Sequence, residues 1–271
     1  MLAHLKLGAL PFQPKPTDLA FKAYLAPGHD QLIDAAMSPA ALNWHKVPTA
    51  SGDMPTPNRD PLNNNIHGNC VLATGANGAM QVSQMVGAPR IITGAEVDAA
   101  YADLEPGFDP VTGTGDNGTY PVKFLTKWSK QDYFGTRVLA FARVDETKPE
   151  EVALAMFLAG WLFAAYDLPL SAQDQVDANG NPDWRVDPNR SAKDNERRGW
   201  GGHAECEHAV RMRQGTTWGL NSHATEEWCQ QYTSSLHLVL LRDWRLPSGR
   251  APNGFAYEQL LVDAQARGAL G

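Results

Sequence analysis

The most regular run of apolar and small residues in the chain follows directly on a polar loop. The loop, residues 63–69, consists mainly of asparagine, histidine and glycine, and Cys70 opens the apolar run behind it. Apolar residues then recur with helical spacing and leave hardly any polar face. This pattern predicts a buried helix over 70–86, with Asn69 as the residue that caps its start.

Beyond this helix, the pattern predicts mainly helices early in the chain and mainly strands late in it. Helical spacing recurs at 17–25, 94–103, 121–130, 148–159, 224–232 and 255–267, and Thr93 is expected to cap the second of these helices. Alternating or continuously apolar stretches, which are typical of strands, lie at 138–144, 161–168, 201–212, 216–219 and 235–242. Helices followed by strands predict an α+β fold.

Prolines, glycines and asparagines divide the chain into an arm and one domain. Three prolines favour an extended arm over 1–16, and 39–68 reads as a long surface loop that leads to the polar segment before Cys70. We expect an arm and short helix over 1–45 and a single domain over 46–271. Its helical half covers about 46–135, its β-rich half about 136–245, and a closing helix 255–267.

Composition narrows the classes of function. The net charge of −7 argues against a nucleic-acid or anionic-membrane surface, because such surfaces need a basic face. Apolar runs are too short for a membrane span, and the first residues lack the pattern of a signal peptide. Three cysteines without a secretion signal indicate reduced thiols rather than a disulfide framework.

Cys70 is the candidate with the clearest chemistry. A thiol at the first position of a helix lies at the positive end of the helix dipole, which favours the nucleophilic thiolate. A buried structural cysteine is the alternative interpretation. Thiol hydrolysis further requires an imidazole, a group that orients it, and donors for the oxyanion.

Two histidines could supply the imidazole. His203 follows Gly201-Gly202 at the start of a predicted strand, whereas His208 lies five residues further along it. The return strand ending at Trp218 leaves room for two strands and a turn after His203, but only for a very tight hairpin after His208. We favour His203 and keep His208 as the alternative.

The return strand offers the orienting group, and the loop before the helix offers an oxyanion donor. Thr217 or Thr216 is the direct choice for orienting the imidazole, and Asn221 is a further candidate. Asn64 lies six residues before Cys70, so its side-chain amide could donate to an oxyanion alongside the Cys70 N–H.

These segments carry a resemblance to the papain-like cysteine peptidases. A cysteine that opens a buried helix, an amide six residues earlier, a late histidine and a strand ending in Thr217-Trp218-Gly219 occur in the order that this superfamily shows. The sequence is most similar to the divergent papain-like proteins of bacteriophages and prophages. The segments that resemble theirs are Asn64–Cys70, Asp116-Asn117-Gly118-Thr119, Leu168–Gln173, Trp200–Ala204, Thr217-Trp218-Gly219 and Pro252-Asn253-Gly254-Phe255.

The resemblance implies a fold, an activity and a setting. It implies a helical lobe with the Cys-bearing helix packed on an antiparallel sheet or barrel lobe, and hydrolysis of a peptide or protein substrate without a cofactor. Catalytic roles would fall on Cys70, His203, Asn64 and Thr217. The setting would be the cytoplasm of a bacterial host or a virion, with phage structural proteins as further partners and no nucleic acid or membrane.

One departure from the papain pattern supports a second hypothesis. Papain-like enzymes orient the imidazole with asparagine, whereas Thr216 or Thr217 occupies that place here, and a hydroxyl accepts more weakly than an amide. Glu205 and Glu207 also make the histidine strand unusually polar. A catalytically weak or silent component of a phage particle with the same fold is therefore the alternative function.

Other polar groups have simpler interpretations. A zinc site at His203, Glu205, Cys206 and His208 is disfavoured because these residues alternate between two faces of a strand. Residues 177–183 resemble a calcium loop but carry Pro182 where glycine is needed, so a turn is expected. We interpret His67 and the pair Arg197-Arg198 as solvated loop residues.

Overall fold

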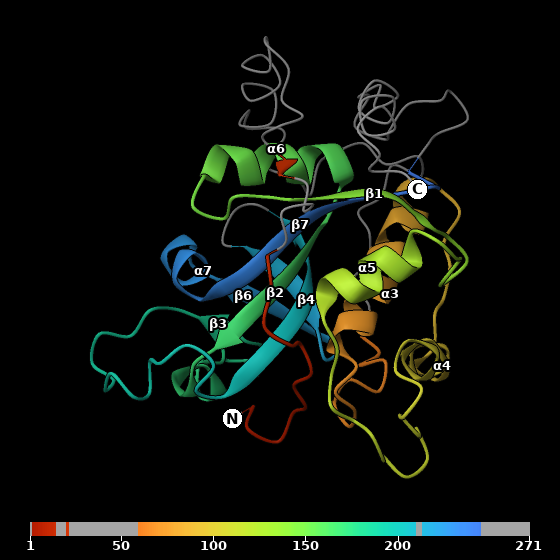
Figure 1. Cartoon of the computed structure of the whole chain (residues 1–271). Coiled ribbons are helices and arrows are strands. Elements are labelled where there is room, and N and C mark those ends of the chain that lie inside the picture. The colour runs from red at the N-terminus through yellow and green to blue at the C-terminus, as the bar shows by residue number, and fades with distance from the viewer. Residues whose placement is uncertain (1, 15–19, 22–58, 210–212, 245–271) are drawn as a thin grey trace.

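The computed structural model describes residues 2–14, 20–21, 59–209 and 213–244. The predicted helices at 17–25 and 255–267, most of the 39–68 loop and the boundary between 45 and 46 lie outside these residues. For the described part, the mixed α+β architecture predicted from the sequence is confirmed (Figure 1).

A seven-stranded sheet runs through the described part of the chain in the order β1-β7-β2-β4-β5-β6-β3 (Figure 1). Its neighbouring strands are antiparallel, except that β3 runs parallel to β6. The strands are β1 Val138–Arg143, β2 Leu162–Leu168, β3 Asp183–Trp184, β4 Gly201–Ala209, β5 Gln214–Thr217, β6 Leu220–Ala224 and β7 Thr233–Leu241. The sequence did not predict β3 or β6; β6 contains Asn221, Ser222 and His223, which hide its alternation.

The helices match their predicted positions closely. They are α3 Cys70–Met85, α4 Gly94–Leu104, α5 Pro121–Trp128, α6 Pro149–Ala159 and α7 Glu226–Tyr232, with a short 3-10 helix, η3, at Leu170–Gln173. The predicted cap of α4 is confirmed as a full capping box, because Thr93 and Glu96 each accept a bond from the other's backbone N–H.

Helix α3 is buried on nearly all sides, as its apolar pattern predicts. It packs beside α4 and α5 on one side and against β4 on the other (Figure 1). Two of its small residues permit this close packing: a Cβ on Gly75 would lie 2.6 Å from the Phe124 ring, and a Cβ on Gly78 would overlap the Trp161 ring. The helix that starts at Cys70 is therefore held rigidly against the sheet.

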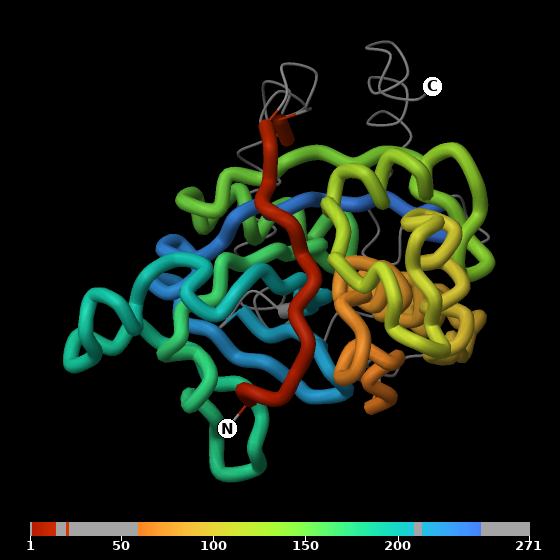
Figure 2. Tube along the Cα trace, turned by 60° about the horizontal axis from the view of Figure 1, so that its bottom comes forward, coloured from red at the N-terminus to blue at the C-terminus, as the bar shows by residue number. Residues whose placement is uncertain are grey.

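The N-terminal arm crosses the boundary between the helices and the sheet (Figure 2). We use the name arm for residues 2–14. Its backbone pairs with both sides: the Gly8 and Ala9 N–H groups donate to the Gly202 carbonyl, and Leu10 N–H donates to the Thr119 carbonyl. The arm thus connects the segment just before α5 to the start of β4. It does so close to Cys70, the first residue of α3.

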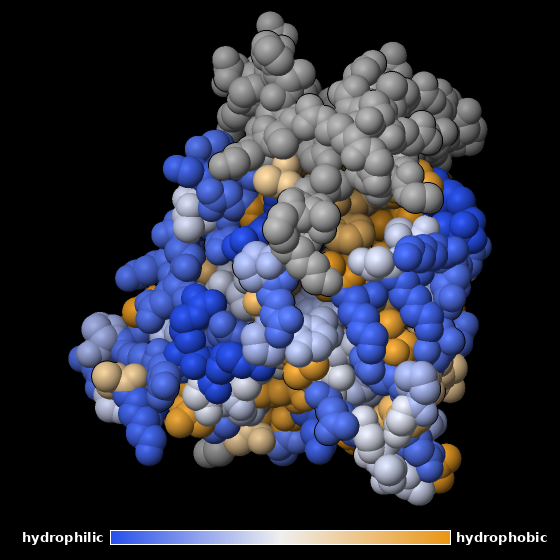
Figure 3. All heavy atoms as spheres, viewed as in Figure 1, coloured by the Kyte–Doolittle hydropathy of each residue, from blue (hydrophilic) through white to orange (hydrophobic). Residues whose placement is uncertain are grey.

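No helix within the described ranges is long and apolar enough to cross a bilayer. On the face seen in Figure 3, hydrophobic side chains are scattered among hydrophilic ones outside the area that grey atoms cover.

Candidate active site

Cys70 is the first residue of α3, as predicted, but Asn69 caps the helix differently from the expectation. Its carbonyl accepts the N–H groups of Leu72 and Ala73, whereas its side chain makes no capping bond. The Asn69 amide instead donates to the Leu62 carbonyl and to Asp98. The side chain therefore fixes the loop rather than the helix end.

A buried carboxylate, Asp98 on α4, organises the polar loop before Cys70. Its oxygens accept hydrogen bonds from the side-chain amides of Asn63 at 2.6 Å and Asn69 at 2.9 Å, and Asp98 Oδ1 lies 2.9 Å from His67 Nδ1. His67 is buried and lies edge-on to Phe108. The interpretation of His67 as a solvated loop histidine is therefore wrong, because Asp98 draws it inward.

A second carboxylate, Asp116, holds the other end of the same loop. Both of its oxygens accept the Gly68 N–H, at 2.8 and 3.0 Å. The Tyr101 hydroxyl donates to Asp116 and accepts the Gly118 N–H at 2.8 Å. These bonds tie Gly68, two residues before the cysteine, to the segment that leads into α5.

His203 lies near the start of β4 with its ring enclosed. Its Nε2 is 2.5 Å from Thr217 Oγ1 on β5, and its ring stacks on Trp218 with centroids 4.0 Å apart and planes at 18°. The other ring nitrogen, Nδ1, is buried and has no hydrogen-bond partner among the described residues. The imidazole is thus oriented from one side and has its second nitrogen available for a proton.

Of the three candidates for the orienting group, the recorded bond to His203 comes from Thr217. Thr216 is paired with Cys206 of β4 and with Asn221 of β6 in the sheet. Its pairing therefore belongs to the sheet and not to the His203 ring. His208, the alternative imidazole, lies five positions along β4 and near the strand's irregular end. The roles of these residues stay predictions, although the geometry around His203 favours the first choices.

Cys70 lies where α3 packs on β4, beside the backbone of the residue that follows His203. The Cys70 thiol interacts with the backbone of Ala204, the residue that follows His203, and with the backbone of Gly8, Val71 and Ala9. Burial nevertheless raises the pKa of this thiol to about 12, because removal from water outweighs those backbone bonds. In this closed structure the helix start therefore does not produce the thiolate that its position alone predicts.

Burial acts on the histidine in the opposite direction. It lowers the pKa of His203 to about 3, since the imidazolium is the form that loses solvation. With both groups fully enclosed, the neutral thiol and neutral imidazole are the favoured pair.

The arm covers Cys70 and makes contacts on both sides of it. Besides donating to Gly202, its backbone accepts the Thr119 N–H at Gly8, and the Lys6 carbonyl accepts the Trp218 indole N–H. Added Cβ atoms on Gly8, Gly118 and Gly202 would overlap backbone across this contact, and one on Gly68 would approach the Leu7 carbonyl to 3.1 Å. We call the space between Gly68, Gly118 and Gly202 the arm groove.

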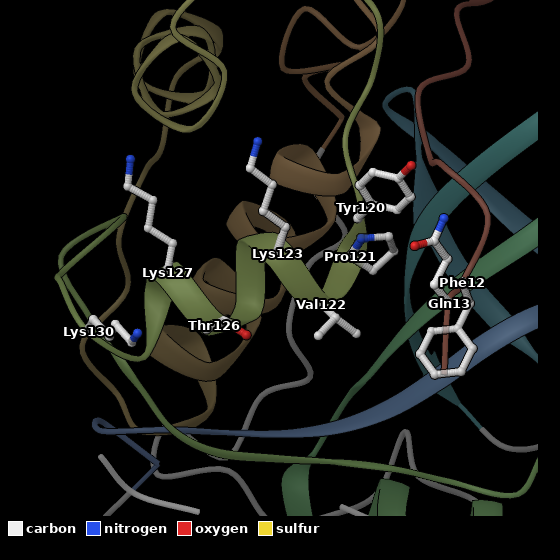
Figure 4. A pocket seen from close by; sticks show the side chains of 9 residues that line it. All are labelled: Phe12, Gln13, Tyr120, Pro121, Val122, Lys123, Thr126, Lys127 and Lys130. Atoms are coloured by element: carbon white, nitrogen blue, oxygen red, sulfur yellow. The ribbon is translucent and has the colours of Figure 1, made fainter. Parts of the chain in front are cut away.

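A pocket of about 540 Å³ lies on the surface beside the last residues of the arm. Phe12 and Gln13 of the arm line one side, and the exposed face of α5 with its leading Tyr120 lines the other (Figure 4). Three lysines, Lys123, Lys127 and Lys130, stand along this face; Lys123 pairs with Glu105 and Lys127 with Asp103. The arm therefore leaves the site by way of a partly apolar, partly basic depression.

Asn64 occupies the expected place but is engaged locally. It is buried six residues before Cys70, and its side-chain Nδ2 donates to the His67 carbonyl at 3.3 Å. The amide has a second N–H. Its role as an oxyanion donor stays a prediction.

Glu205 and Glu207, which lie on the same face of β4 as His203, are also buried. Glu207 forms a two-pronged bond with Arg213 at 2.7 Å and also accepts from Tyr166, while Glu205 accepts from Ser222 at 2.6 Å. Burial, together with the nearby charge of Glu207, raises the pKa of Glu205 to about 8. The unusual polarity of the strand thus belongs to an internal network that fixes the β4–β5 hairpin.

The pair Arg197-Arg198 is partly exposed, as the sequence predicts, but it is also bound to the protein. Both guanidinium groups bind Asp167, at 2.8 Å each. Arg198 also donates to the Ala9 carbonyl of the arm at 3.2 Å, whereas Arg197 donates to the carbonyls of Gln231 and Thr233. One arginine therefore faces the arm groove and its neighbour faces the scaffold.

The segments considered for metals have other roles. Within the described ranges, no group of three or more histidine, cysteine, aspartate or glutamate residues could hold a metal ion. In the segment that resembles a calcium loop, Asp177 accepts the backbone N–H groups of Asn179 and Asn181. That arrangement is an aspartate-stabilised turn.

Sequence reasoning missed the residues that act across long chain separations. No sequence pattern marks Asp98 or Tyr101 as part of the site, Arg198 reads as a solvated loop residue, and the prolines around Gly8 predict only an extended arm. The only local signal was glycine itself at 68, 118 and 202, which indicates positions where another backbone comes close.

Comparison with known proteins supports the fold. No family model matches the sequence, and no curated protein matches it. The structure is similar to that of xylellain, a cysteine protease from Xylella fastidiosa, with a TM-score of 0.54 and 10% sequence identity over 88% of this chain and 96% of that one. Procathepsin L 3 of the Tenebrio molitor larval midgut matches with a TM-score of 0.42 and 11% identity over 81% and 90%. The chain therefore has the fold of xylellain.

Proposed function

We propose that this protein is a papain-like cysteine peptidase or amidase of phage or prophage origin, with a helical lobe and a sheet lobe that meet at the site. The observation that carries the proposal is the junction of α3 and β4. There Cys70 lies against the residue that follows His203, and His203 is held by Thr217 and Trp218. The ordered motifs that resemble phage papain-like proteins support the origin, and a host cytoplasm or virion setting goes with it.

The reaction begins with proton transfer within the pair. Cys70 passes its proton to His203, and the thiolate attacks the carbonyl carbon of a peptide bond to form a tetrahedral oxyanion. The Cys70 N–H, one of the helix-start groups without an intrahelical acceptor, and the Asn64 amide stabilise that oxyanion. His203 then donates the proton to the leaving amine as the C–N bond breaks, and a thioester remains.

Water completes the cycle. His203 accepts a proton from a water molecule, whose oxygen attacks the thioester carbon; the C–S bond breaks and the acid is released. Thr217 keeps the ring in place during both proton transfers. Because a hydroxyl can donate as well as accept, it fixes the tautomer of His203 less strictly than an amide oxygen would.

The arm must leave its groove before this chemistry can begin. In the closed structure Cys70 and His203 have no exposed surface, and both pKa values are shifted toward the neutral forms. Access of water to the groove removes the desolvation that causes both shifts. The pair can then exchange a proton near neutral pH.

The test uses the full chain with its arm displaced. Gly8→Leu adds a side chain whose Cβ would overlap the Gly68 carbonyl, so we expect the arm to leave the groove. This variant should hydrolyse peptides from a fluorogenic library, and the double variant Gly8→Leu/Cys70→Ala should not. Absence of hydrolysis with an accessible Cys70, shown by alkylation, would reject the enzyme.

The silent structural component is the second candidate, and the closed arm favours it. Such a protein would keep Cys70 covered in its working state, with the arm as part of the fold. It predicts that the protein copurifies with phage particles and that a Cys70→Ala phage assembles and infects normally. Loss of infectivity or of a processed phage protein in that mutant would instead support the peptidase.

A further inference from the structure

Arg198 is a charged residue that binds the arm close to the candidate site. Its guanidinium donates to the Ala9 carbonyl at 3.2 Å, one residue beyond the glycine that covers Cys70. The same group lies over Gly202, where an added Cβ would be 2.8 Å from one of its terminal nitrogens. Arg198 therefore forms part of the wall beside His203.

The chain holds this guanidinium in place from two directions. Asp167 on β2 accepts Arg198 Nη1 at 2.8 Å, and this carboxylate is itself mostly buried. The backbone of Arg198 has a φ of 61°, in the left-handed region that residues with a side chain rarely adopt. Such strain is maintained only where the surrounding structure imposes it.

The local charge balance is positive. Asp167 is a single carboxylate that binds two guanidinium groups, those of Arg197 and Arg198. The other N–H groups of Arg197 donate to the carbonyls of Gln231 and Thr233, away from the arm groove. Arg198 is thus the member of the pair that presents its charge to whatever occupies the groove.

The neutral Ala9 carbonyl occupies only part of the hydrogen-bonding capacity of the Arg198 guanidinium. An arginine has five N–H donors in a planar fork, which matches the two oxygens of a carboxylate. The Ala9 carbonyl accepts from Nη2 alone. A carboxylate at the same place would gain both the opposite charge and a second acceptor oxygen.

We propose that Arg198 is a substrate-binding residue that selects peptides with a carboxylate where the Ala9 carbonyl now lies. The proposal rests on the proposed peptidase function and names its substrate class. The carboxylate has two sources, an acidic side chain next to the scissile bond or the free carboxyl terminus of a short peptide. Arg198 binds either one by the same contacts.

The experiment measures how well defined peptides protect Cys70 from iodoacetamide in the full-length Gly8→Leu variant. The probes are acetyl-Ala-Ala-Asp-Ala-amide with its Asn counterpart, and acetyl-Ala-Ala-Ala as free acid and as amide. The Asp peptide or the free acid should give half-protection at about a tenfold lower concentration than its neutral counterpart, as expected for one charge-assisted bond. The pair that differs identifies the source of the carboxylate.

Two arginine variants make the result specific. Arg198→Gln in the same background should abolish the tenfold difference, whereas Arg197→Gln, which removes the neighbour that shares Asp167, should retain it. Circular dichroism checks folding, and Gly8→Ala replaces Gly8→Leu if the larger residue prevents folding. Equal protection by acidic and neutral peptides, or a preference that survives Arg198→Gln, would overturn the proposal.

This readout separates the proposal from the function on which it rests. Protection reports binding at Cys70 without any turnover. A protein that binds acidic peptides through Arg198 but cleaves none would refute the peptidase and keep the binding site. A protein that cleaves acidic and neutral peptides equally would keep the peptidase and refute the role of Arg198.

Discussion

The two walls of the arm groove are stabilised in different ways. The cysteine wall is a loop held by carboxylates that collect hydrogen bonds from neutral donors, namely Asp98 and Asp116. The histidine wall is a hairpin held by an enclosed ion pair, Glu207–Arg213, and a neutral acid, Glu205. The comparison shows that the loop before Cys70 is held by hydrogen bonds from neutral donors to two carboxylates, whereas the strand that carries His203 is held by a buried ion pair and a neutral acid.

Breaking the ion pair should have the largest effect on the histidine wall. Arg213→Met leaves the buried Glu207 without its cation, which should lower the free energy of unfolding by about 3–5 kcal/mol. Urea denaturation measures the loss. The double variant Glu207→Leu/Arg213→Met should recover much of it, because no buried charge is then unpaired; a double variant as unstable as the single one would contradict this account.

Removing Asp98, the central acceptor of the cysteine wall, should lower the free energy of unfolding by less than Arg213→Met does. Asp98→Ala leaves the amides of Asn63 and Asn69 without their shared acceptor in a loop, part of which can reach water, and we expect a loss of about 2–3 kcal/mol. Thermal and urea unfolding measure it. Ser83→Ala on α3, which removes only bonds within the 80–90 region, is the matched control. A loss equal to that of Arg213→Met would erase the difference between the walls.

The neutral acid gives the histidine wall a pH dependence of its own. The folded pKa of Glu205, about 8, lies above its ordinary value, so its contribution is full below about pH 4.5 and is lost as pH rises to about 8. The unfolding free energy should fall by at most about 1.4 kcal/mol per pH unit in that window. His203 acts oppositely, since its lowered pKa makes stability fall as pH drops below about 6.5.

Glu205→Gln separates these two contributions. The difference in stability between the native protein and this variant should change with pH between about 4.5 and 8 and stay constant outside it. A variant that follows the native protein in parallel across this window would mean that Glu205 is ionised in the folded state.

The smallest effect concerns the hydroxyl that orients His203. In the Gly8→Leu background, Thr217→Val keeps the shape of the side chain and removes the bond to Nε2, and the rate of Cys70 alkylation at neutral pH should fall about tenfold, or about 1.4 kcal/mol. Thr216→Val, one residue away in the same strand, should leave the rate unchanged. Equal effects of the two variants would remove Thr217 from the site.

Local patterns predicted the elements that carry the site. The helical spacing after Cys70 located α3, the Thr93 box located the start of α4, and the spacing from His203 to Trp218 located the β4–β5 hairpin. Each of these depends on residues close together in the chain, where periodicity and capping chemistry act.

What the sequence could not predict depends on contacts between distant residues. The arm lies beside Gly202 and Trp218, about two hundred positions away, and its prolines predict only an extended shape. Burial of Cys70 beneath the arm and against β4 reverses its expected thiolate character. The roles of Asp98 and Arg198 likewise depend on partners that are distant in the sequence, His67 for Asp98 and the Ala9 carbonyl for Arg198.

The most direct test of the central claim is the alkylation of the three cysteines, followed by peptide mass spectrometry, in the native protein and in the Gly8→Leu variant. We predict that Cys70 reacts slowly in the native protein and rapidly in the variant, that His203→Ala in the variant removes this gain, and that Cys206 and Cys229 stay unreactive throughout. Equal reactivity of the three thiols, or a Cys70 rate that does not depend on His203, would contradict a Cys–His site closed by the arm.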